Sequence, residues 1–331
     1  MNTRILGIEI GTAMIKIVEV SKYRGKLMVQ KYSLIETPGQ CICNGIISKI
    51  GPIQEIIANE LKKQKYHAHK VIVVIQSKEV IVRHVLVNHQ SEKIIRQILA
   101  IKMEEFLPIN RKEYQVDFKV IAQIKDDENI KSKIRLVAAP NKLVLPIVEL
   151  MKNLKLKLIG ITAASEGIEN IIRQEQEQRE NQLDQVMILD IGGYSTALTM
   201  LDKDGELYTH IIDYGMAHTW QLIESIGYSK EEVTEEILLR GILPQVEYHI
   251  LSAIESILRF YNTKHQMRQM DKIYLIGGGA EIKGLRSYIR DALNVPTEKM
   301  NQLETVMIAP GVQFETNIRF FVNILGGISA L

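Results

Sequence analysis

The 331-residue sequence has only two cysteines, the residues whose disulfide bonds cross-link small secreted proteins, and one tryptophan. Cys41 and Cys43 are separated by one residue, which excludes a disulfide framework and is a poor start for a four-ligand zinc site. No apolar run approaches the ~20 residues that a membrane-spanning helix needs. The N-terminal residues lack the long apolar stretch of a signal peptide. We therefore expect a cytoplasmic protein whose thiols are free.

An excess of either charge sign is also absent. The sequence has 41 Lys and Arg against 39 Asp and Glu, a formal net charge of +2. Because the charges are interspersed rather than blocked, they do not indicate nucleic acid or anionic lipid as a partner. With 46% apolar and 24% charged residues the composition is that of a globular protein, and the length allows about two domains.

One pattern occurs twice in the sequence. An apolar, β-rich segment ends in a glycine-bearing turn and is followed by two further strands. Strands are expected at 4–10, 14–20 and 26–37 in the first copy, and at 186–190, 195–201 and 206–213 in the second. Such a duplication predicts an α/β protein with two similar lobes.

Other segments follow different patterns. Residues 79–160 have the order strand, helix, strand, strand, and we expect them to form a small module inserted into the first lobe. Apolar residues at helical spacing predict one long helix at 243–264. The apolar run near the C-terminus predicts a packed helix.

Three glycine-bearing turns follow apolar strands. They comprise Gly7 to Lys16, Asp190 to Thr196, and Gly277 to Ala280. Glycine allows a backbone to approach a ligand closely, so that successive N–H groups can converge on phosphate oxygens. One such turn is weak evidence, because any hairpin can need glycine. Three of them on duplicated units indicate a cleft with phosphate-binding backbone on both walls.

Two other nucleotide motifs fail on single positions. A P-loop starting at Gly279 would need a lysine where the chain has Leu285. A dinucleotide fingerprint starting at Gly277 would place its third glycine at Ile282, and no βαβ unit surrounds it. The glycine turns therefore belong to neither motif.

The three turns resemble the phosphate 1, phosphate 2 and adenosine motifs of the actin-like ATPases, the superfamily of actin, Hsp70 chaperones and sugar kinases. Within that superfamily, nearly the whole chain is similar to the PilM family of type IV pilus assembly. The similarity includes segments without catalytic meaning, among them the inserted module, residues 81–85 and residues 137–140. The position of the insertion is shared with the cell-division protein FtsA and differs from that in actin.

The resemblance implies an actin-like, ribonuclease H-like duplicated ATPase fold, with two lobes around a nucleotide cleft. The expected subdomains are 1A at 1–78 and 160–185, the inserted 1C at 79–159, 2A at 186–224 and 272–312, and 2B at 225–271. The C-terminal helix at 313–331 is expected to pack near the cleft.

ATP and Mg²⁺ are the ligands that the resemblance implies. The groups expected to bind the nucleotide are Gly11, Thr12, Ala13, Lys16, Gly192, Gly193, Tyr194, Glu235, Gly277, Gly278, Gly279 and Ala280. Asp190 and Glu9 are expected to hold Mg²⁺ through water. The family lysine near the nucleoside is replaced by Leu238, so we expect weaker nucleoside contacts than is usual in the family.

The resemblance further implies a scaffold that docks the cytoplasmic N-terminus of a PilN-type inner-membrane protein. The protein would then stay at the inner face of the cell membrane through this partner. The inserted module offers several strand edges that an extended peptide could augment. Because the sequence marks no residue as a general base for water, we expect at most slow ATP hydrolysis.

Two alternative functions remain open from the sequence. A small-molecule kinase of the same superfamily would need a deep acceptor pocket and a catalytic carboxylate in the first lobe. An FtsA-like filament former would polymerise through the inserted module and reach lipid by a basic amphipathic tail. No Lys or Arg follows Arg319, which counts against such a tail.

Overall fold

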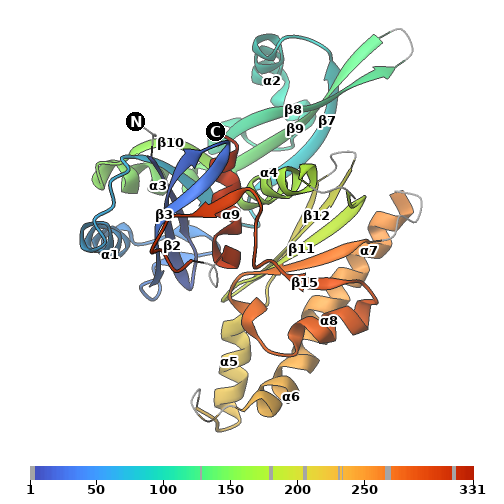
Figure 1. Cartoon of the computed structure of the whole chain (residues 1–331). Helices are drawn as coiled ribbons and strands as arrows, with labels where there is room; N and C mark the ends of the chain where they lie inside the picture. The colour runs from blue at the N-terminus through green and yellow to red at the C-terminus, as the bar shows by residue number, and fades with distance from the viewer. Residues whose placement is uncertain are drawn as a thin grey trace.

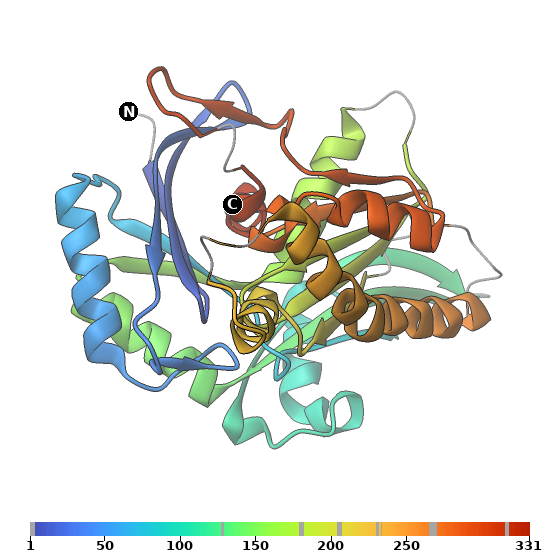
Figure 2. The same ribbon diagram turned by 90° about the horizontal axis from the view of Figure 1, so that it is seen from below.

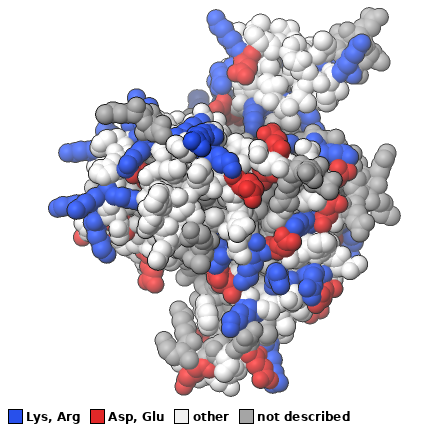
Figure 3. Space-filling view, viewed as in Figure 1, with Lys and Arg blue, Asp and Glu red and all other residues white. Residues whose placement is uncertain are grey.

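The computed structural model describes residues 4–126, 129–178, 182–203, 207–229, 232, 234–264, 270–314 and 318–331. Two large β-sheets form two lobes, and a smaller sheet protrudes as a module from the first lobe (Figure 1). Lys and Arg side chains are interspersed with Asp and Glu over the face seen in Figure 3. That face therefore carries no large patch of one charge sign.

The first lobe is built on a six-stranded sheet with the order β10-β6-β1-β2-β3-β16. Its strands are β1 (Arg4–Ile10), β2 (Met14–Tyr23), β3 (Lys26–Glu36), β6 (Lys70–Ile75), β10 (Lys157–Ala163) and β16 (Val306–Ile308), with a small ribbon of β4 (Ile42–Cys43) and β5 (Ile46–Ile47) beside it. Alternate side chains of a strand point to opposite faces. Leu6 and Ile8 therefore pack with α1 (Ile50–Lys63) and α3 (Asn141–Asn153), whereas Ile5 packs with α4 (Ala164–Glu177) and α9 (Ile318–Ser329).

The second lobe repeats the meander on a five-stranded sheet with the order β13-β12-β11-β14-β15. Its strands are β11 (Gln185–Ile191), β12 (Thr196–Asp202), β13 (Leu207–Ile212), β14 (Lys272–Ile276) and β15 (Thr297–Lys299), and its helices are α5 (Met216–Ser225), α6 (Glu235–Gln245), α7 (Ser252–Lys264) and α8 (Leu285–Leu293). Every residue of β11 is buried, because helices cover both faces of the strand. Both meanders that the sequence predicted are present.

Two segments differ from the sequence prediction. The long helix expected at 243–264 is instead α6, a π-helical segment, η2 (Val246–Leu251), and then α7. Pro244 lies inside α6, where it removes a helical hydrogen bond, and the wider π-helical turn follows directly. Residues 306–308, expected in the second lobe, pair in parallel with β3 of the first sheet. The local sequence pattern of residues 306–308 does not reveal which distant strand they pair with. The other subdomain boundaries stay predictions.

The inserted module is a three-stranded sheet with one helix. It contains β7 (Ile81–Asn88), α2 (Glu92–Phe106), a short turn η1 (Arg111–Glu113), β8 (Tyr114–Asp126) and β9 (Asn129–Pro140), in the sheet order β7-β9-β8. Ile95, Leu99 and Met103 of α2 cover one face of this sheet. On the other face, Arg135 of β9 and Lys119 of β8 contact α4.

A buried ion pair connects the module to α4. Arg135 of β9 is fully buried and donates to both carboxylate oxygens of Glu169, to Glu166 Oε1 at 2.9 Å and to His84 Nε2 at 3.0 Å. Burial alone would raise the pKa of Glu169, but the hydrogen bonds and charge of Arg135 outweigh it and hold that pKa below its ordinary value. Since an unpaired charge at this depth would be costly, the pair fixes the module on α4.

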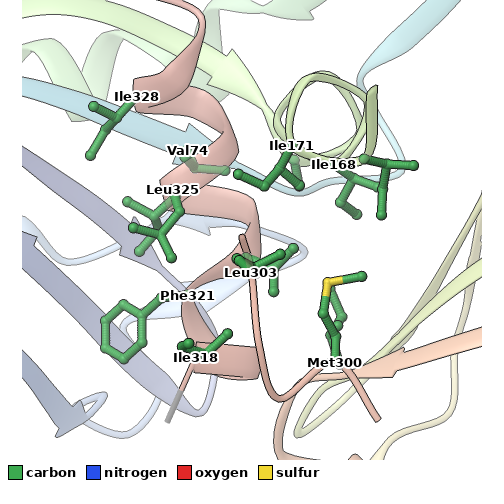
Figure 4. Packing of buried hydrophobic residues seen from close by; sticks show 14 of the residues in the cluster. Val74, Ile168, Ile171, Met300, Leu303, Ile318, Phe321, Leu325 and Ile328 are labelled. Carbon is green, nitrogen blue, oxygen red and sulfur yellow. The ribbon is translucent and has the colours of Figure 1, made fainter. Parts of the chain in front are cut away.

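Helix α9 lies between the two lobes (Figure 2). Its apolar side chains and those of α4 share one core with residues of both sheets, such as Val18 and Ile188. Figure 4 shows this packing for Phe321, Leu325 and Ile328 of α9, Ile168 and Ile171 of α4, and Val74 of β6. The lobes are therefore joined by a continuous apolar core that contains α9.

Glycines allow α4 and α9 to cross closely. A Cβ on Gly326 would overlap the carbonyl oxygen of Gly167, and a Cβ on Gly167 would overlap the carbonyl oxygen of Asn323. Both obstacles are backbone atoms, which cannot move aside as the end of a flexible side chain can. Any side chain at either position would have to push the two helices apart.

We predict that Gly326→Ala lowers the free energy of unfolding by about 2 kcal/mol or more, because the added methyl group separates the helices. Gly51→Ala is the matched control, since a Cβ on Gly51 in α1 meets nothing within 4 Å. The control should change stability by less than about 1 kcal/mol, in the stabilising direction. Urea titration of both variants measures the difference. Equal effects would contradict the proposed steric limit at the crossing.

Candidate functional site

The same backbone hydrogen bond closes the first two glycine turns. Gly11 N–H donates to Met14 O at 3.0 Å, and Gly192 N–H donates to Ser195 O at 2.9 Å. In the first lobe, Thr37 Oγ1 also donates to Gly11 O at 2.7 Å. The duplicated sequence pattern thus produces duplicated turns with a fixed backbone.

The three glycine turns lie side by side. A Cβ on Gly193 would lie 2.5 Å from Ala13 Cβ, so the first-lobe and second-lobe turns are in contact. Gly277 has a φ of +78°, which favours glycine, and a Cβ there would overlap the side chain of Asp190 and lie 2.7 Å from Ile191 O. The structure therefore brings the turns from both lobes to one place.

The remaining predicted nucleotide residues occupy these turns or their borders. Thr12 belongs to the first turn, Tyr194 to the second, and Gly278, Gly279 and Ala280 to the short helix η3 (Gly278–Glu281) after β14. Glu235 begins α6, but its side chain lies outside the described part of the chain. Its contact with a nucleoside stays a prediction.

Two carboxylates, one ammonium group and one amide form the polar centre between the turns. Lys16 Nζ lies 2.6 Å from Glu9 Oε1. Asn323 Nδ2 donates to Asp190 Oδ2 at 2.9 Å and to Glu9 Oε2 at 3.3 Å. Glu9, Asp190 and Asn323 are all buried, with 5%, 4% and 2% of their surface exposed. The centre thus joins Glu9 of β1, Asp190 of β11 and the helix between them.

Burial and neighbouring charges shift the pKa values of Glu9 and Lys16. Burial raises the pKa of Glu9, and the attraction of Lys16 only partly offsets it while the charge of Asp190 adds to it. Burial would lower the pKa of Lys16, but the charges of Glu9 and Asp190 outweigh this and raise it. Lys16 is therefore a permanent cation in the site. The net charge of −1 from two carboxylates and one ammonium group favours a further cation.

Sequence reasoning missed Asn323. The C-terminal segment was expected only to pack near the cleft, which gave its polar residue no role. The available signal was a single amide in the apolar run of α9, Ile318–Ser329. A buried amide needs hydrogen-bond partners, and here the partners are the two carboxylates that the sequence predicted to hold a metal ion.

His218 is a second residue that the sequence reading did not select. It lies in α5 directly after Ala217, whose N–H donates to Gly193 O at 2.6 Å. Its Nδ1 accepts the N–H of Gly215 at 3.2 Å, and its ring stacks on Tyr214 at 5.7 Å. Because Nδ1 is occupied as an acceptor, the imidazole is set to donate through Nε2. This arrangement is suited to binding an oxygen atom and not to removing a proton from water.

Two features are absent from the described residues. No three His, Cys, Asp or Glu side chains are grouped so that they alone could hold a metal ion. In the same part of the chain, no helix combines the length and the apolar character that crossing a membrane requires. A site formed by two carboxylates therefore needs water or a ligand to complete a metal's coordination.

The inserted module carries a separate groove of about 350 Å³ between α2 and β8. Its walls include Leu99, Ala100 and Met103 on the helix and residues 114–118 on the strand. Arg96 crosses it, 3.0 Å from Asp117 Oδ1. The groove has polar and apolar lining residues and is bordered by β8, a strand at the edge of its sheet.

Two duplicated lobes whose glycine turns meet at buried carboxylates define an actin-like protein, and solved structures of this fold match the chain. The fold is shared with a PilM-PilN type IV pilus biogenesis complex (TM-score 0.80, 20% identity, 98% of this chain and 97% of the other). It is also shared with the ethanolamine utilization protein EutJ of Carboxydothermus hydrogenoformans (TM-score 0.55, 12% identity, 98% and 89%) and with ADP-bound MreB5 of Spiroplasma citri (TM-score 0.52, 13% identity, 98% and 95%).

A family model gives the more specific result. The model of the type IV pilus assembly protein PilM matches residues 7–321. The chain belongs to the PilM family. The actin-like fold and the family that the sequence predicted are thereby confirmed, and membership in this superfamily of ATPases indicates a nucleotide-binding protein.

Replacing Lys16 tests the electrostatics of the site without any ligand. Lys16→Met leaves two buried carboxylates without their cation, and we expect a loss of about 3 kcal/mol of stability at pH 7. The loss should shrink as the pH falls, because protonation of Glu9, whose pKa is already raised, relieves the unpaired charge. Urea titrations at pH 7 and pH 5.5 measure both effects. Lys22→Met, an exposed position in the same strand, is the control. A loss independent of pH would contradict the pairing of Lys16 with Glu9.

Proposed function

We propose that this protein is a cytoplasmic, ATP- and Mg²⁺-binding scaffold of type IV pilus assembly. It docks the cytoplasmic N-terminus of a PilN-type inner-membrane protein and stays at the inner face of the membrane through this partner. The observation that carries the proposal is the match of the PilM family over residues 7–321. One solved structure of the same fold is itself a PilM-PilN complex.

The nucleotide would bind where the three turns meet. The first-lobe turn lies against the second-lobe turn at Gly193, where the N–H groups of Thr12 and Ala13 would reach the phosphates. The N–H of Gly11 is already bonded to Met14 O, so Gly11 would contribute through the close approach of its backbone. Lys16 would add a positive charge to the site. The third turn would accept adenine and ribose against glycines, where no side chain obstructs a close approach.

The residues at the centre suit Mg²⁺. Glu9 and Asp190 supply carboxylate oxygens, which are the ligands that Mg²⁺ prefers, and their combined charge exceeds that of Lys16. Asn323 Oδ1 is buried and has no hydrogen-bond partner among the described residues, which marks a position where a donor such as water fits. Bound there, Mg²⁺ would neutralise phosphate charge.

Calorimetry with ATP tests the nucleotide site. We expect wild-type protein to bind ATP in Mg²⁺, and Asp190→Asn to weaken that binding by about tenfold or more, because one negative charge of the cation site is lost. Asp184→Asn is the control, since Asp184 is exposed and paired with Lys203 on the surface. An unchanged ATP affinity in Asp190→Asn would contradict the proposed nucleotide and Mg²⁺ site.

The partner peptide would bind in the groove of the module between α2 and β8. An extended peptide can add to a free strand edge, with its side chains entering an adjacent pocket. Strand β8 is an edge strand of its sheet and lines the groove with residues 114–118. The buried pair of Arg135 and Glu169 would hold this docking module on the first lobe.

We test docking with a peptide covering the cytoplasmic N-terminus of the PilN-type partner and fluorescence anisotropy. Ala100→Trp fills the groove, and we expect affinity to fall about tenfold or more. Ile101→Ser is the matched control on the next residue of α2, which is 85% exposed and does not line the groove. If only Ile101→Ser lost peptide binding, the peptide would bind on the outer face of α2 and not in the groove. No binding by wild-type protein would refute the scaffold.

A further inference from the structure

Helix α9 carries one amide in an apolar sequence, and that amide lies at the cation site. Asn323 donates to Asp190 Oδ2 at 2.9 Å and to Glu9 Oε2 at 3.3 Å, so one side chain bridges carboxylates of both lobes. One turn earlier on the helix, the carbonyl oxygen of Arg319 accepts the N–H of Gly277 at 3.1 Å. The same helix therefore contacts the carboxylates and the third glycine turn.

The orientation of the amide is fixed by its partners. Ionised carboxylates only accept hydrogen bonds, so the NH₂ group of Asn323 must face Glu9 and Asp190. The side-chain oxygen must then point away from them. This oxygen is buried and has no hydrogen-bond partner among the described residues. An unsatisfied buried acceptor in a polar centre indicates the place of an absent donor.

We propose that Asn323 is the third group of the cation site, a role that rests on the proposed binding of Mg²⁺ with ATP. Without the ion, its NH₂ group holds the two carboxylates in place. With the ion, its side-chain oxygen accepts a hydrogen bond from a water molecule of the ion's hydration shell. Mg²⁺ retains several waters when few protein ligands are present, and each of these waters needs an acceptor.

An amide serves this position better than a third carboxylate. Three buried carboxylates against one Lys16 would leave a net charge of −2 when no cation is bound, which is costly at this depth. A neutral amide accepts from water equally well and keeps the net charge at −1. It also donates to the carboxylates, which a third acid could do only when protonated.

The experiment compares ATP affinity in Mg²⁺ and in EDTA, measured with a fluorescent ATP analogue. Wild-type protein should bind at least about tenfold more tightly in Mg²⁺. In Asn323→Leu, which preserves size but not polarity, the ratio of ATP affinity in Mg²⁺ to ATP affinity in EDTA should be much smaller than in wild type. Ile324→Val, a buried packing change on the same helix, should retain that gain. A full gain in Asn323→Leu would overturn the proposal.

A second measurement uses no nucleotide. Asn323→Asp should have a lower melting temperature than wild type in EDTA, and Mg²⁺ should raise it by about 4 °C or more, because the ion neutralises the added charge. The rise should be much smaller in Asn323→Leu. If wild-type protein does not bind ATP, the nucleotide proposal fails, and this measurement alone decides the role of Asn323. Absence of a Mg²⁺-dependent rise in Asn323→Asp would overturn it.

Discussion

The close crossing of α4 and α9 is the contact on which the rest of the structure depends. Only glycine at 167 and 326 allows the two helices to approach so closely. This approach places the apolar side of α9 in a core shared by both sheets, and the one amide of the helix between carboxylates of both lobes. On its other side, α4 carries the carboxylate that binds Arg135 of the inserted module. Two helices thus connect the polar centre between the lobes with the module.

Hydrogen bonds and one ion pair hold the polar centre in place, although its two carboxylates and one ammonium group leave a net charge of −1. Lys16 and Asn323 together satisfy the two carboxylates, so the site keeps its geometry before any ligand arrives. A preorganised site of this kind loses little entropy on binding. Because Lys16 is paired with Glu9, a bound cation must share this carboxylate with Lys16. This sharing limits the affinity of the site for the cation. This is consistent with a nucleotide that supports the fold of a scaffold more than it drives chemistry.

The sequence was sufficient where the chemistry is local. An apolar strand followed by a glycine turn is recognisable without a structure, and so Asp190 and the three turns were predicted together. Asn323 was not, because its function depends on helix α9 lying between strands that are more than 130 residues away in the chain. The pairing of β16 with β3 was not predicted for the same reason, because the two strands are far apart in the chain. The π-helical segment depends on how the chain adjusts after Pro244, which propensity alone does not specify.

The route of the chain also has a consequence for folding. Residues 306–308 complete the first sheet, and α9 covers the face that carries Val18 and Val74. Helix α4 covers part of that face, but the rest stays exposed until α9, about 300 residues after the first strands, has been synthesised. Contacts of such long sequence separation slow folding and leave apolar surface exposed meanwhile. The first lobe, although begun first, is therefore the part of the nascent protein that most needs protection from aggregation.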